Sequence, residues 1–231
     1  MSHPVNQSAT IPPLEESLAR VRSRIEAASA RSGRRPAEVR LIGVTKGVPP
    51  AAVVAAVRAG LKDLGENYVQ DLMAKRSAAP GARWHFIGRL QRNKVRRVLD
   101  HADVVHTLEP GAATDRLAEL VAEAGPVECL IEVDFTGRRV GVDPAELDAF
   151  AAGLIEERAV PVRGLMTVAP QEGDPRRWFA RLRDLRDGLA GRFDGVRELS
   201  MGMSIDLEAA VEEGATMVRV GTAIFGPRPG G

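Results

Sequence analysis

The feature that most constrains the fold is a regular alternation of short apolar runs with segments of helical spacing along the 231 residues. The apolar runs cover residues 39–44, 61–64, 83–87, 104–107, 128–133, 162–166, 198–201 and 217–220. Between them, apolar residues recur three and four positions apart, as in Leu147, Phe150, Ala151, Leu154 and Ile155. Strands that alternate with helices form parallel sheets, and eight such units favour a closed barrel over an open sheet. The sequence therefore predicts a single (β/α)8 TIM barrel.

An additional helix is predicted before the first strand. Apolar residues recur there on one helical stripe: Leu14, Leu18, Val21, Ile25 and Ala28. Pro12 and Pro13 stand just ahead of it, where proline is tolerated. No linker interrupts the later alternation, so we expect a flexible tail over residues 1–12 and one domain over residues 13–228.

Composition excludes several classes of protein. Hydrophobic residues make up 44% of the chain, which is enough to build a core, and the formal net charge is +1. This balance gives no general reason to expect a nucleic acid or a membrane as partner. The longest apolar run, residues 51–57, is far shorter than the ~20 residues of a membrane-spanning helix. One cysteine, no Cys-x-x-Cys pair and no secretory signal indicate a cytoplasmic protein.

Lys46 is the first candidate for chemistry. In TIM barrels the active site lies at the carboxyl ends of the strands, and Lys46 follows the first predicted strand. Ile42, Val44 and Lys46 share one face, so the lysine amine reaches the barrel mouth if the other two point inward. A desolvated lysine can act as a nucleophile toward an aldehyde. A lysine that simply extends into water from the strand end is an equal alternative.

Arg219 is the second candidate, because it interrupts an apolar strand. It shares a face with Met217, opposite Val218 and Val220, and a buried guanidinium requires an acceptor. The acceptor could be an inward carboxylate, such as Glu132 or Asp134, or it could be a ligand. We favour the ligand because candidate phosphate-binding loops are adjacent.

These loops follow the last two predicted strands. Residues 201–204 lead into a predicted helix over 206–213, and Gly221 and Thr222 open a short helical turn. Glycines allow close backbone approach, hydroxyl groups donate hydrogen bonds, and the loops after strands seven and eight often hold phosphate in this fold. An amine, an arginine and an anion site together suit a phosphorylated aldehyde. Pyridoxal phosphate (PLP) and the substrate of a phosphosugar aldolase both meet that description.

Several segments resemble the PLP homeostasis protein family, which is similar in fold to the N-terminal barrel of bacterial alanine racemase. The resemblance extends from about Leu14 to Phe225 and is carried by residues 43–46, 65–68, 84–94, 164–166, 199–204 and 218–226. It implies a PLP-binding protein of vitamin B6 homeostasis that buffers the cofactor or delivers it to apoenzymes.

The resemblance also implies roles for individual residues. Lys46 would hold PLP as a Schiff base, Arg219 would face the pyridine nitrogen, and Asn67 would lie near the ring. Ser204, with the Gly221 and Thr222 amides, would hold the phosphate. His85 and Met203 are further candidates near the cofactor, although His85 fits a core position better than that of a catalytic base. A monomer is the expectation for such a family.

The chain departs from the family pattern at two places. Thr45-Lys46-Gly47 stands where Ser-Lys-Thr is typical, which removes a hydroxyl group beside the lysine. The segment 134–141 is shorter than usual and lacks the customary Ser-Lys-Ser-Gly, so the family role of that loop does not transfer.

A non-catalytic carrier is favoured over a racemase-like enzyme. Arginine stays protonated and does not supply a proton to the pyridine nitrogen, which leaves the ring a poorer electron sink. Racemisation then needs a second base, which alanine racemases obtain from a tyrosine of a second domain and a partner subunit. We expect no such domain here, and the single tyrosine, Tyr68, follows the second predicted strand.

Nucleic-acid binding and metal binding are the remaining classes. The basic residues Arg89, Arg92, Lys94, Arg96 and Arg97 cluster, but without stacking aromatics they indicate a solvated helix face. The four histidines lack metal-ligand spacing, so no metal site is expected.

Overall fold

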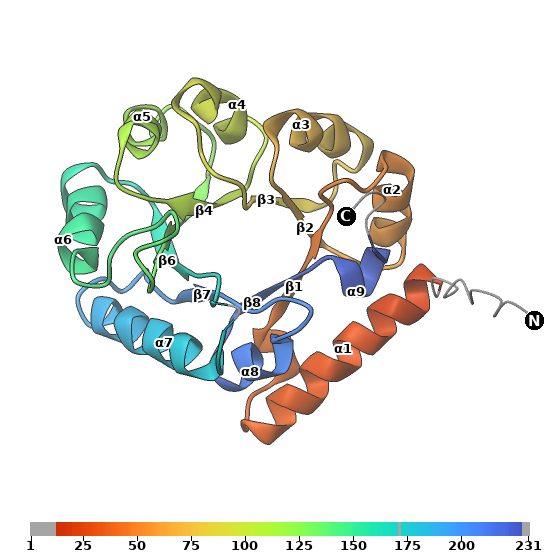
Figure 1. Ribbon diagram of the computed structural model, residues 1–231. Coiled ribbons are helices and arrows are strands. Elements are labelled where there is room, and N and C mark those ends of the chain that lie inside the picture. Colours follow the sequence, from red (N-terminus) through yellow and green to blue (C-terminus); the bar gives the residue numbers. More distant parts are fainter. Residues whose placement is uncertain (1–12, 171, 228–231) are drawn as a thin grey trace, which may run out of the picture.

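The computed structural model describes residues 13–170 and 172–227, and these form a closed barrel of parallel strands surrounded by helices (Figure 1). The predicted tail, residues 1–12, lies outside the described residues, as does Arg228. The strands are β1 (Arg40–Val44), β2 (Asp63–Glu66), β3 (Arg83–Phe86), β4 (Val104–Leu108), β5 (Glu128–Glu132), β6 (Val162–Met166), β7 (Glu198–Ser200) and β8 (Met217–Val220). Each pairs with its neighbour in sequence, and β8 pairs with β1. The prediction of a TIM barrel is confirmed.

Helices follow the strands and cover the outside of the barrel (Figure 1). They are α2 (Pro50–Arg58), α3 (Val69–Ala78), α4 (Val95–Leu99), α5 (Ala112–Leu120), α6 (Leu147–Ala152), α7 (Arg176–Ala190), α8 (Leu207–Glu212) and α9 (Thr222–Phe225). Short 3-10 turns cover Pro36–Glu38 and Arg92–Lys94, and α6 continues into a π-helical segment, Gly153–Glu157.

The predicted N-terminal helix is present as α1 (Leu14–Arg31). Its stripe of apolar residues is buried, and the helix packs against α8 and α9 outside the barrel (Figure 1). α1 therefore lies beside the two helices that directly follow the predicted phosphate-binding loops.

Two boundaries differ from the apolar pattern. β2 begins at Asp63, two residues after the predicted start, and extends through Gly65 and Glu66, which carry no hydrophobic signal. α5 ends at Leu120, and although Val121 and Ala124 continue the helical spacing of Leu117 and Leu120, they lie in turns before Gly125 and Pro126. In both cases apolar residues are buried outside a regular element, so burial alone does not mark the boundary.

The barrel interior holds an apolar cluster and a polar group of side chains. Apolar side chains from five strands form the cluster: Ile42, Val104, Leu130, Met166 and Met217. Ile42 and Met217 thus point inward, which is the condition that Lys46 requires of Ile42, and Ile42 pairs in register with Arg219. The buried polar residues His85, His106, Ser200 and Arg219 accompany this cluster.

Candidate functional site

A cavity of about 570 Å³ opens at the carboxyl ends of the strands, beside the loops that follow β7 and β8. Five predicted site residues line it: Met203, Ser204, Arg219, Gly221 and Thr222. The Thr222 Oγ1 lies 3.2 Å from the Ser204 Oγ, so hydroxyl groups from the two loops meet at one point. The sequence separates these loops by a helix and a strand, and the barrel brings them together.

The loop between β7 and α8 is held in place from three sides. Gly202 has a φ of +89°, and a Cβ there would lie 2.3 Å from the Ala210 Cβ, so this position requires glycine. The Asp206 Oδ1 accepts a hydrogen bond of 2.6 Å from the Met203 amide. Arg24 of α1 donates to the Ser204 carbonyl at 2.9 Å. The Ser204 hydroxyl is therefore presented from a fixed backbone.

Arg219 is buried in the barrel and bonds to neutral oxygens. Its Nη1 donates to the Ser200 Oγ at 2.6 Å, and its Nη2 donates to the Thr167 carbonyl at 2.8 Å. Within the described part of the chain it forms no ion pair, so neither Glu132 nor Asp134 is a direct partner. Burial lowers the pKa of Arg219 to about 10, against the attraction of Glu132 and Asp206. The guanidinium remains charged at neutral pH and lines the cavity.

Neither of the two carboxylates proposed as alternative partners bonds directly to Arg219. Asp134 folds the loop after β5, because its side chain accepts hydrogen bonds from the Thr136 hydroxyl and from the Thr136 and Arg139 amides. Glu132 ends β5 and is 9% exposed. Burial raises the pKa of Glu132 to about 7, and the Arg219 charge opposes this rise.

Lys46 lies two residues beyond Val44, and Val44 lines the cavity. The Lys46 Nζ lies 5.2 Å from the ring centroid of Tyr68, a cation–π contact at the end of β2. Lys46 itself does not line the cavity, so the structure places the amine at the same rim but outside the part where the predicted phosphate-binding loops lie. Val44, two residues before Lys46, lines the cavity and so lies between the lysine and the loops after β7 and β8.

Sequence reasoning missed a buried ion pair beside Lys46. The Lys75 Nζ of α3 lies 2.5 Å from the Glu66 Oε1 of β2, and both side chains are almost completely buried. Lys75 also donates to the Thr45 carbonyl at 2.6 Å, and the Thr45 hydroxyl donates to Glu66 at 2.7 Å. Thr45, the residue directly before Lys46, is thereby held by hydrogen bonds to both Lys75 and Glu66. A lysine within a helical segment gives no sequence signal of this role.

Asn67 also lies at this rim. Its amide donates to the Glu66 Oε2 at 3.1 Å, and its carbonyl approaches Gly88 so closely that a Cβ on Gly88 would lie 2.0 Å away. His85, by contrast, is fully buried inside the barrel and bonds to Asp63 and His106. His85 and Asn67 are both absent from the cavity lining, and His85 occupies the core position that its sequence context favoured.

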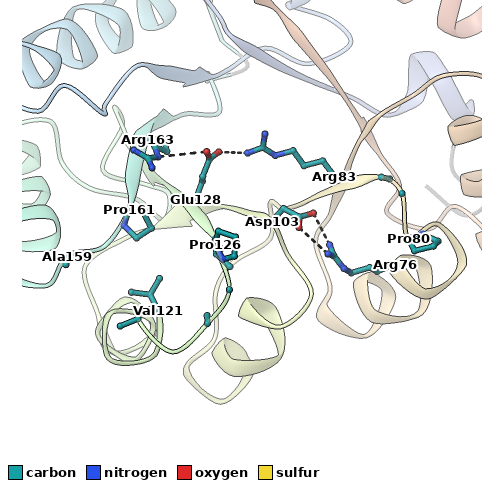
Figure 2. A pocket seen from close by; sticks show the side chains of 16 residues that line it. Arg76, Pro80, Arg83, Asp103, Val121, Pro126, Glu128, Ala159, Pro161 and Arg163 are labelled. Carbon is teal, nitrogen blue, oxygen red and sulfur yellow. Dashed lines mark hydrogen bonds and ion pairs between the residues drawn. The ribbon is translucent and has the colours of Figure 1, made fainter.

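Figure 2 shows the residues that line a second cavity, of about 700 Å³. Arg83 and Glu128 are the first residues of β3 and β5, so this cavity lies where the strands begin, at the opposite end of the barrel from the site. Its charged side chains are paired with one another: Arg76 with Asp103 at 2.9 Å, and Glu128 with both Arg83 and Arg163. The pairing neutralises most of the charge, so this cavity offers no ligand chemistry comparable to that of the mouth.

None of the helices within residues 13–170 and 172–227 has the length and hydropathy of a membrane-spanning segment. Within the same ranges, no three histidine, cysteine, aspartate or glutamate side chains are arranged to hold a metal ion.

Comparison with known proteins gives the same two resemblances at sequence level. The profile of the "Alanine racemase, N-terminal domain" family matches residues 17–229. The pyridoxal phosphate homeostasis protein of Escherichia coli (strain K12) is 40% identical over 226 residues, covering 93% of this chain and 97% of that protein. The protein of the same name from Aquifex aeolicus is also 40% identical, covering 92% of this chain and 97% of its own length.

Solved structures agree. PipY of Synechococcus elongatus PCC7942, whose structure is known with PLP bound, is 36% identical, with a TM-score of 0.81, over 92% of this chain and all of that chain. Alanine racemase of Oenococcus oeni is 17% identical with a TM-score of 0.66, covering 93% of this chain and 63% of that one, which shows a common fold.

Proposed function

This chain belongs to the pyridoxal phosphate homeostasis protein family, within the wider alanine racemase N-terminal domain family, and on that premise we propose that it binds pyridoxal 5′-phosphate and maintains its intracellular supply. The observation that carries the proposal is the convergence of hydroxyl groups, a buried guanidinium and a lysine amine at one end of the barrel. The structure of the relative PipY with PLP bound supports it.

The donor set fits each part of that cofactor. Ser204 and Thr222, with the Gly221 backbone, supply hydroxyl and amide donors for the phosphate. Arg219 supplies a donor for the ring nitrogen, and its pKa of about 10 keeps the proton on the guanidinium at neutral pH, so it does not act as an acid there. Asn67 lies at the end of β2 next to Tyr68, where we place it beside the ring.

Lys46 supplies the covalent attachment in this proposal. Its Nζ lone pair attacks the aldehyde carbon, a C=N bond forms, and the aldehyde oxygen leaves as water with the two amine protons. The reaction needs no oxidant or reductant. PLP supplies an aldehyde that is reversibly captured, and the protein residues bind and orient it.

Carriage rather than turnover is the role that the site supports. Arg219 donates to the ring nitrogen but retains its proton, which weakens electron withdrawal by the ring. The alternative, a racemase-like enzyme, requires a second base, and Tyr68 lies on the Lys46 side of the mouth. Incubation with amino acids in heavy water separates the two: a carrier leaves the α-hydrogens unexchanged, and an enzyme exchanges them.

Delivery to apoenzymes, a cytoplasmic location and a monomeric state belong to the same proposal. Three large apolar side chains are exposed on loops at the mouth: Tyr68 (53%), Met203 (38%) and Ile205 (96%). In the proposal they form the surface that contacts an apoenzyme. Cys129 is buried, and burial raises the pKa of its thiol to about 12, so it stays an unreactive thiol.

The proposal predicts that Lys46→Ala abolishes covalent PLP binding. Wild-type protein mixed with PLP is expected to show a visible Schiff-base band, and borohydride should convert it into a stable adduct on the peptide that contains Lys46. Lys62→Ala, at an exposed lysine, is the matched control and should bind normally. An unchanged band in Lys46→Ala, or an adduct on another lysine, contradicts the proposal.

A further inference from the structure

A chain of hydrogen-bonded side chains crosses the barrel interior and ends on Arg219. The His85 Nε2 lies 3.0 Å from the Asp63 Oδ1, and the His85 Nδ1 lies 2.8 Å from the His106 Nε2. The His106 Nδ1 lies 2.9 Å from the Ser200 Oγ, which accepts from the Arg219 Nη1 at 2.6 Å. The links join β2, β3, β4, β7 and β8.

The two ends of the chain set the direction of its hydrogen bonds. Arginine only donates, so the Ser200 oxygen accepts from Arg219. An ionised aspartate only accepts, so the His85 Nε2 carries hydrogen. With both rings neutral, the His85 Nδ1 then accepts from the His106 Nε2–H, and the His106 Nδ1 accepts from the Ser200 hydroxyl. Every link thus has one hydrogen, and each imidazole is the Nε2–H tautomer.

The surroundings keep both imidazoles neutral. His85, His106 and Ser200 are fully buried. Asp63, at the end of the hydrogen-bonded series away from Arg219, has a side chain that is 14% exposed. Burial lowers the pKa of His85, although Asp63 favours its charged form. Burial lowers the pKa of His106 strongly, and His85, Arg219, Arg40 and Arg83 add to this effect. A proton on His106 would face the buried Arg219 charge across Ser200.

We propose that Asp63, His85, His106 and Ser200 are positioning residues that hold the Arg219 guanidinium toward the cavity with a fixed set of donors. Ser200 donates to His106 and thereby becomes a better acceptor for Arg219, because hydrogen bonds in a chain polarise one another. The Thr167 carbonyl holds the second nitrogen. The remaining N–H groups of Arg219 stay available to an acceptor on the ligand. The contact between Arg219 and the ligand rests on the proposed function, whereas the direction of the hydrogen bonds from Arg219 to Asp63 does not.

The direction is testable on the protein without PLP by ¹⁵N NMR of the histidine side chains. Only four histidines are present in the sequence, and the half-buried His101 can be assigned with His101→Gln. Both His85 and His106 are expected as Nε2–H tautomers that keep this form from pH 6 to pH 8. Ser200→Ala removes the donor to the His106 Nδ1 and should change the signal of that nitrogen. An Nδ1–H tautomer on either ring, or ordinary titration, overturns the proposed chain.

The coupling to the ligand is tested by PLP affinity. Ser200→Ala leaves Arg219 short of an acceptor, and we expect PLP to bind about tenfold more weakly, the usual scale for a hydrogen bond to a charged group. Ser200→Thr keeps the hydroxyl group and should restore most of the affinity. Ser77→Ala, at an exposed serine of α3, is the control. Equal affinity of folded Ser200→Ala and wild type overturns the coupling.

Failure of the proposed function gives a different result. If wild-type protein does not bind PLP, the proposed function is wrong. The NMR spectra of the PLP-free protein still show whether the hydrogen bonds from Asp63 to Arg219 run in the proposed direction.

Discussion

Glu132 lies inside the barrel at the end of β5, two residues beyond the inward Leu130. Burial raises the pKa of the Glu132 carboxyl group to about 7. The positive charge of Arg219 opposes this rise, although the two side chains form no ion pair. The carboxyl group therefore changes charge near neutral pH beside the cavity. A sequence pattern places Glu132 on an inward face but does not show whether a partner neutralises it.

We predict that Glu132→Gln stabilises the protein at high pH. The folded pKa lies above the ordinary carboxyl value, so the folded state keeps a proton that the unfolded state loses between about pH 4.5 and pH 7. The stability that this proton contributes is complete below that window and is lost as the pH rises through it. Urea unfolding should show the variant more stable than wild type by about 3 kcal/mol at pH 8, and the difference should vanish near pH 4.5. Glu157→Gln, at an exposed position, is the control. A difference independent of pH contradicts the prediction.

Helix α3 is joined to β1 and β2 by charge as well as by apolar packing. Lys75 contacts both Glu66 and the Thr45 carbonyl, so one helical side chain holds the ends of two neighbouring strands. A buried ion pair adds modestly to stability, because desolvation offsets the attraction, but removal of one partner leaves an uncompensated charge. The position of the Lys46 backbone thus depends on a helix that contributes nothing to the cavity lining.

Lys75→Met is therefore expected to destabilise the protein by about 3–5 kcal/mol, because Glu66 remains buried without its counter-ion. Chemical denaturation of the variant and the wild type measures the difference. Arg116→Met, which breaks the exposed pair of Arg116 with Glu119, serves as the comparison and should have little effect. Equal losses in the two variants would show that Glu66 is not buried as described.

At the scale of the whole molecule, the barrel joins its two ends through its interior. Asp63 stands at the start of β2, Arg219 lines the cavity at the opposite end, and two neutral imidazoles lie between them. Outside the barrel, α1 reaches the same cavity, because Arg24 holds the Ser204 carbonyl and pairs with Glu208. The site is thus supported by the first helix and by strands from most of the barrel.

The buried histidines predict acid destabilisation of the entire fold. The pKa values of His85 and His106 are lowered in the folded state, so below about pH 6.5 the unfolded chain binds protons that the folded chain does not. As the pH is lowered below this value, the free energy of unfolding should decrease by up to about 1.4 kcal/mol per pH unit for each histidine. Unfolding in a Glu132→Gln background measures this, because Glu132 acts in the opposite direction over the same range. A flat profile from pH 6.5 to pH 5 would contradict neutral, buried rings.

The sequence by itself determined the barrel, the N-terminal helix and the rim positions of Lys46, Ser204 and Arg219. Alternation, helical spacing and strand ends are local properties, so they can be read along the chain. The tertiary structure alone decided the Lys75–Glu66 pair, the contact of Ser204 with Thr222, and the chain from Asp63 to Arg219. Each of these joins side chains from different elements, and their contact depends on strand register, barrel closure and loop geometry, which residue spacing does not specify.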